Sequence, residues 1–62
     1  MINPTENDIG RRVIYVPDHA DGVFHPDSQP GRIKSFTDNY VFVLYHSGDT
    51  AAATLRENLE WN

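Results

Sequence analysis

The chain has 62 residues, of which nine are acidic and five are basic, so its formal net charge at neutral pH is −4. This length supports a single domain of modest stability, and the absence of cysteine excludes disulfides and thiolate metal sites. The acidic balance disfavours nonspecific binding to nucleic acid and adsorption to anionic membranes. No apolar run approaches the roughly 20 residues that cross a bilayer. The N-terminus lacks the basic and apolar regions of a signal peptide, so we expect a cytoplasmic protein.

Residues 1–8 are polar and contain Pro4. Thr5 and Asp8 have the spacing of a capping box, which allows either one helical turn or a frayed tail. We therefore predict an N-terminal tail over residues 1–8 and one small domain over residues 9–62.

The first strand is predicted over residues 11–16, with Val13 and Tyr15 on one face, and Pro17 ends it. The long irregular loop over residues 18–30 follows, and loops of this length are often functional. Phe24 interrupts its polar residues. Phe24 either folds back as a lid on the core or binds a partner.

Residues 32–36 predict a second strand with Ile33 pointing inward, and turn residues 37–39 make a hairpin with the next strand. That strand, Asn-Tyr-Val-Phe-Val-Leu-Tyr over residues 39–45, is the most apolar stretch. Alternation places Val41, Val43 and Tyr45 on one face and Tyr40, Phe42 and Leu44 on the other. Both faces are apolar, so the pattern predicts a strongly bent sheet, a small barrel or a partner subunit, with Val43 fully buried.

A tight turn is predicted at residues 46–49, and two interpretations remain for the C-terminal segment. As a helix, it would place Ala52, Leu55 and Leu59 on one face. As a strand over residues 50–53, it would be followed by a capping box from Thr54 to Glu57 and a short last strand. We favour the second interpretation.

The order of strands, long loop, hairpin and late helical turn resembles the small Src-homology-3-like barrels, including their Tudor and KOW variants. The resemblance covers residues 9–61 and implies an all-β fold with five bent strands. Residues 8–17, the run His25-Pro26-Asp27 and residues 40–43 are also similar to small uncharacterised phage and prophage proteins. This second resemblance implies a phage or prophage accessory protein, acting in the host cytoplasm if it is phage-encoded.

Catalytic and metal-binding motifs are weak. The sequence has neither a nucleophile elbow nor a phosphate-binding glycine loop, so we expect no enzyme activity. Histidines and aspartates lie within residues 18–27 and 46–49, but their spacing is irregular for zinc, so we assign no metal site and no cofactor. The residues considered for a metal were His19, His25, His46, Asp18, Asp21, Asp27 and Asp49.

The aromatic side chains exceed what one face of a small barrel needs, which indicates a partner surface. The predicted partner-binding residues are Phe24, Tyr40, Phe42 and Leu44. The favoured function is a non-enzymatic protein-interaction module, with a host protein or a second copy as partner. The alternative is a nucleic-acid-associated barrel that uses Arg12, Arg32 and Lys34, unless these residues form surface ion pairs with Asp38, Glu57 or Glu60.

Overall fold

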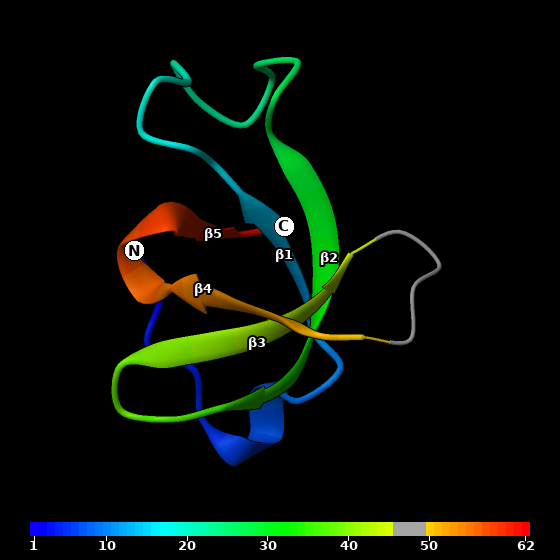
Figure 1. Cartoon of the computed structure of the whole chain (residues 1–62). Helices are drawn as coiled ribbons and strands as arrows, with labels where there is room; N and C mark the ends of the chain where they lie inside the picture. The colour runs from blue at the N-terminus through cyan, green and yellow to red at the C-terminus, as the bar shows by residue number, and fades with distance from the viewer. Residues whose placement is uncertain (46–49) are drawn as a thin grey trace.

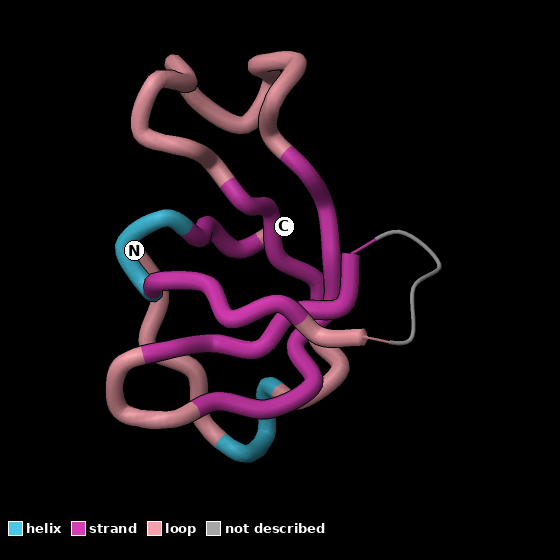
Figure 2. Tube along the Cα trace, in the orientation of Figure 1, coloured by secondary structure: helices cyan, strands magenta, loops and turns pink. Residues whose placement is uncertain are grey.

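A computed structural model describes residues 1–45 and 50–62, and the turn predicted at 46–49 lies outside this part of the chain. The chain forms five antiparallel strands in one sheet of order β4-β3-β2-β1-β5, with two short 3-10 turns (Figures 1 and 2). This confirms the all-β prediction. The elements are η1 (Glu6–Asp8), β1 (Arg12–Tyr15), β2 (Gln29–Phe36), β3 (Tyr40–Tyr45), β4 (Ala52–Leu55), η2 (Arg56–Asn58) and β5 (Leu59–Trp61).

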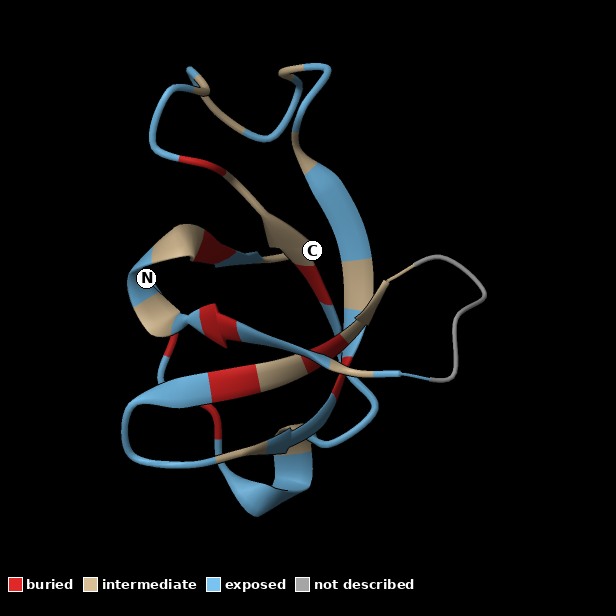
Figure 3. Ribbon diagram, in the orientation of Figure 1, coloured by how far each residue is buried: buried red, intermediate tan, exposed pale blue. Residues whose placement is uncertain are grey.

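The core lies on one face of this sheet, which we call the inner face (Figure 3). Val41 and Val43 of β3 are fully buried, as alternation predicts, and Ile33 of β2 pairs directly with Val43. Val13 and Leu59 bring β1 and β5 into the same cluster. Half-buried aromatic side chains surround this aliphatic centre, namely Tyr15, Phe36, Tyr45 and Trp61.

Strand β2 is longer than predicted because it begins at Gln29 and includes Pro30. Proline has no backbone N–H group, so it cannot donate a hydrogen bond to a neighbouring strand. At Pro30, β2 pairs with Ile14 of β1, and the described pairing of β2 with β3 begins at Gly31. Pro30 is the second residue of β2, close to the first position of a strand, where proline is tolerated in sheets.

The C-terminal segment is a strand, a 3-10 turn and a second strand, so the helical interpretation is wrong. The predicted capping box beginning at Thr54 is also wrong, because Leu55 is the N-cap residue and makes no side-chain cap. The Thr54 hydroxyl lies 2.8 Å from the Tyr45 hydroxyl and donates to the Ala52 carbonyl at 3.3 Å. These bonds occupy the Thr54 side chain within β4, so it does not reach the turn.

The N-terminal segment contributes to the core, which its polar composition did not suggest. Ile2 is only 1% exposed, and its backbone N–H donates to the Arg56 carbonyl at 3.2 Å. Further along, the predicted turn forms: the Asp8 carboxylate accepts bonds from the Thr5 amide at 2.9 Å and the Thr5 hydroxyl at 3.2 Å. This segment is therefore packed against the domain from Ile2 onward.

The predicted closed barrel is not confirmed, because the sheet is open, with β4 and β5 at its two edges. The long first loop is present between β1 and β2 (Figure 1). Phe24 in this loop is 99% exposed, so the prediction that it is a lid on the core is wrong. Within the described residues, no helix has the length and apolar character needed to span a membrane.

Candidate functional site

The two predicted sets of binding residues on the sheet lie side by side on the face opposite the core, which we call the outer face. Arg12 of β1 pairs with Arg32 of β2, and Arg32 pairs with Leu44 of β3. Directly paired residues in an antiparallel sheet project to the same side. The sheet register therefore joins the predicted nucleic-acid residues to the predicted protein-binding residues in one surface.

The apolar part of the outer face is formed by β3 and β4. Tyr40 pairs with Leu55, and Phe42 pairs with Ala53. Tyr40 is 43% exposed and Leu55 is 42% exposed, whereas Phe42 is half-buried. Leu55 was not predicted on this face because the capping-box spacing from Thr54 to Glu57 placed it in a turn. The alternation of the inward residue Thr54 with its neighbour would have placed Leu55 on the outer face.

The basic part of the outer face consists of Arg12, Arg32 and Lys34, all of them exposed. Lys34 is the extra residue of a β-bulge between Ile33 and Ser35. Within residues 1–45 and 50–62, none of these three cations makes a salt bridge, so the ion pairs considered with Asp38, Glu57 and Glu60 are absent there. These side chains can therefore approach a partner without first breaking an ion pair to the described part of the chain.

Unlike Arg12, Arg32 and Lys34, the basic residue Arg11 makes an ion pair within the described part of the chain. The Arg11 guanidinium lies 3.1 Å from the Asp8 carboxylate and 4.1 Å from the centre of the Trp61 ring. Like charges directly opposite each other in a sheet are destabilising. The Arg12–Arg32 pair thus carries a cost that no ion pair within the described residues offsets.

Phe24, the remaining predicted binding residue, is not brought to the outer face. The shallow hollow beside it is lined only by residues 21–25 of its own loop. That loop precedes Gln29, at the Tyr45 end of β3, while Tyr40 lies at the other end of that strand (Figure 1). Phe24 is therefore a separate exposed aromatic residue.

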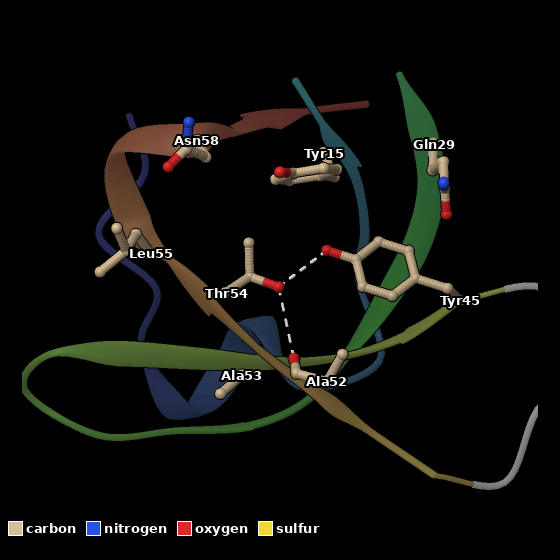
Figure 4. Close-up of a pocket in the computed structure, with 8 residues that line it drawn as sticks. All are labelled: Tyr15, Gln29, Tyr45, Ala52, Ala53, Thr54, Leu55 and Asn58. Carbon is tan, nitrogen blue, oxygen red and sulfur yellow. Dashed lines mark hydrogen bonds between the residues drawn. The ribbon is translucent and has the colours of Figure 1, made fainter. Parts of the chain in front are cut away.

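A pocket of about 360 Å³ lies between the edge strand β4 and the facing ends of β1, β2 and β3 (Figure 4). The rings of Tyr15 and Tyr45 are arranged edge to face, with their centres 6.2 Å apart, and both point into the pocket. Burial raises the pKa of the Tyr45 phenol above its usual value. The lining is uncharged and consists of Tyr15, Gln29, Tyr45, Ala52, Ala53, Thr54, Leu55 and Asn58.

Three of the side chains considered for a metal converge in the first loop. His19 Nε2 lies 2.6 Å from an oxygen of the Asp27 carboxylate, and His25 Nδ1 accepts the Asp27 backbone N–H at 3.0 Å. The hydrogen bond with His19 lowers the pKa of Asp27. His46 and Asp49 lie outside the described residues, while Asp18 instead accepts a bond from the Asn58 amide at 2.7 Å.

Comparison with known proteins does not assign the chain to a group. No protein-family model, no curated protein and no solved structure matches it.

Proposed function

We propose that this chain is a non-enzymatic protein-interaction module whose outer face docks a protein surface that carries carboxylates beside an apolar centre. The observation that carries this proposal is the outer face itself. Its apolar part on β3 and β4 is partly exposed, and it adjoins three cations that make no ion pair in the described part of the chain. In a protein of net charge −4, this local positive charge is complementary to an acidic partner.

The two halves of the outer face have different roles in binding. Covering an aromatic side chain such as Phe42 or Tyr40 at an interface contributes about 2 kcal/mol. The cations at Arg12, Arg32 and Lys34 raise the association rate and fix the orientation of the partner more than they raise affinity. Binding should therefore depend on Phe42 at all salt concentrations and on Arg32 mainly at low salt.

The charges also argue against two other occupants. If two copies docked symmetrically through this face, the interface would gather six cations, three from each copy, since a two-fold interface presents the same patch on both sides. Nucleic acid is the second candidate, but three cations neutralise few phosphates, and the rest of the chain is acidic. A distinct acidic protein is the occupant that fits both halves.

The fold and origin that we infer are consistent with this role. The strand order, the long first loop and the 3-10 turn before β5 support an incompletely closed member of the Src-homology-3-like class. The similarity of residues 8–17 and 40–43 to phage and prophage proteins supports an accessory protein that acts on a host protein in the host cytoplasm.

The test is affinity capture from a nuclease-treated bacterial lysate on four parallel columns. The columns carry the unmodified protein, Phe42→Ser, Arg32→Glu and, as a control, Phe24→Ser, which changes an exposed aromatic residue away from the outer face. The proposal predicts an acidic protein that is retained by the unmodified protein and by Phe24→Ser. Phe42→Ser and Arg32→Glu should both lose this protein, and salt should weaken its retention.

Two results would overturn the proposal. Equal retention on all four columns would mean that the outer face is not the docking surface. Retention of RNA or DNA from an untreated lysate, lost on Arg32→Glu and falling steeply with salt, would instead establish the nucleic-acid function.

A further inference from the structure

The first loop gathers three side chains that are suited to bind a transition metal. His19, His25 and Asp27 each offer one ligand atom, and these three atoms lie within 4.8 Å of one another. The two histidine rings meet edge to face, with their centres 5.5 Å apart. Their convergence depends on the folding of the loop, because His19 lies eight residues before Asp27 in the sequence.

Two consecutive turns produce this convergence. The His25 N–H donates to the Gly22 carbonyl at 3.1 Å, and the Ser28 N–H donates to the His25 carbonyl at 3.0 Å. The Ser28 hydroxyl also bonds to the Gly22 carbonyl at 2.8 Å, which ties the two turns together. The loop backbone therefore holds His25 and Asp27 close to each other before any ligand binds.

We propose that His19, His25 and Asp27 form a binding site for a divalent transition-metal ion of the zinc class. Two imidazoles and one carboxylate are a donor set that Zn²⁺, Co²⁺ and Ni²⁺ accept. Ca²⁺ and Mg²⁺ prefer coordination by oxygen alone, so we do not expect these ions to bind at this site. Because Zn²⁺ takes four ligands, one position remains for water or for a group supplied from outside the chain.

Binding requires a small rearrangement of these side chains. Two ligands of a tetrahedral zinc ion lie about 3.3 Å apart when each is about 2.0 Å from the metal. The His19–Asp27 distance of 2.6 Å must therefore open, while any ligand-atom separation between about 3.3 Å and the 4.8 Å limit of the cluster must close. The side chains of His19 and Asp27 are more than half exposed, so they can move without disturbing the core.

Metal binding replaces two hydrogen bonds with metal–ligand bonds. The ion takes the place of the proton shared between His19 Nε2 and Asp27. At His25, the Nδ1 lone pair that accepts the Asp27 N–H turns to the metal, and that amide, in an exposed residue, bonds to water instead. Both exchanges occur at the surface, where water can satisfy the displaced groups.

The test is calorimetric titration of the untagged full chain with Zn²⁺, together with Co²⁺ absorption spectroscopy as a readout of coordination geometry. His19→Ala, His25→Ala and Asp27→Asn each remove one ligand. Asp21→Asn is the matched control, because it removes a carboxylate from the same loop outside the cluster. Mg²⁺ serves as the control ion, and Trp61 fluorescence verifies that each variant is folded.

The proposal predicts one bound Zn²⁺ per chain and a Co²⁺ spectrum typical of a four-coordinate ion. Each ligand variant should lose affinity by about tenfold or more, since even the loss of an outer-shell partner has an effect of that size. Asp21→Asn should bind normally, and Mg²⁺ should not bind. The proposal is overturned if Zn²⁺ does not bind, or if it binds as tightly to folded His19→Ala and Asp27→Asn as to the unmodified protein.

Discussion

The burial of Ile2 makes the N-terminal segment part of the folded domain, and Ile2→Ala tests this directly. The substitution removes three carbon atoms from a side chain that is 1% exposed. Their transfer to water costs about 2.4 kcal/mol at about 0.8 kcal/mol per methylene group. The cavity left behind adds to this cost, so the free energy of unfolding should fall by about 3 kcal/mol. A domain of this size has only about 3–5 kcal/mol of stability from its core, so most of it should be lost.

Ile9→Ala is the matched control, because it makes the same chemical change in the same segment at a side chain that is 46% exposed. The assay is urea denaturation followed by the fluorescence of Trp61, the one tryptophan, which packs against the core. Ile9→Ala should cost less than about 1 kcal/mol. If Ile2→Ala is largely unfolded in water, Ile2→Val provides a measurable loss of about 1 kcal/mol. Equal effects of alanine at positions 2 and 9 would refute the reasoning.

Three further substitutions test the sheet and the first turn. Val43→Ala, at a fully buried side chain, should lower the free energy of unfolding by about 2–3 kcal/mol, and a loss below about 0.5 kcal/mol would contradict the core assignment. Gly31→Ala would place a methyl group 2.5 Å from Val43 Cγ1 and 2.8 Å from the Leu44 carbonyl oxygen. This substitution should therefore lower the free energy of unfolding by about 1–3 kcal/mol, and an unchanged urea midpoint would exclude this crowding. Asp8→Asn tests a carboxyl whose pKa is lowered, chiefly by the bond from the Thr5 N–H. The stability that this carboxylate contributes is complete above its unfolded pKa of about 3.9 and is lost as the pH falls through the lower folded pKa. The urea midpoints of Asp8→Asn and the unmodified protein should therefore converge as the pH is lowered through this range, and a constant difference would contradict the assignment.

Alternation of side chains predicted the sheet well because burial selects one face of each strand. Val41 and Val43 were placed on the buried face, and Tyr40 on the opposite face, from spacing alone. The same argument separated the inward residue Ile33 from its charged neighbours. These predictions succeeded because successive side chains of a strand project to opposite faces, so residues two apart in the sequence share one face.

The features that escaped prediction depend on contacts between distant parts of the chain. Ile2 stands alone among polar residues, so no period marks it as a core residue. Thr54 had capping-box spacing, but the nearby Tyr45 hydroxyl provides its partner. For Phe24 the sequence left two interpretations open, a lid on the core or a partner contact, and only the structure shows that this residue lies in solvent.

The candidate site was predicted in its residues but not in its arrangement. The sequence indicated one set of aromatic and aliphatic residues and a separate set of cations. Only the register that pairs Arg12 with Arg32 and Arg32 with Leu44 shows that they share a face. Register depends on the bulge in β2 and on the turns, neither of which has a reliable pattern in so short a chain.

The measurement that tests the central claim most directly is an NMR titration of the isotope-labelled protein with the captured partner. The proposed docking surface predicts that the largest changes in amide signals will fall on Arg12, Arg32, Lys34 and residues 40–44. Residues 22–25, around Phe24, should change little. Changes concentrated instead on Tyr15, Tyr45 and Thr54 would place the partner in the tyrosine pocket and contradict the assignment of the outer face as the docking surface.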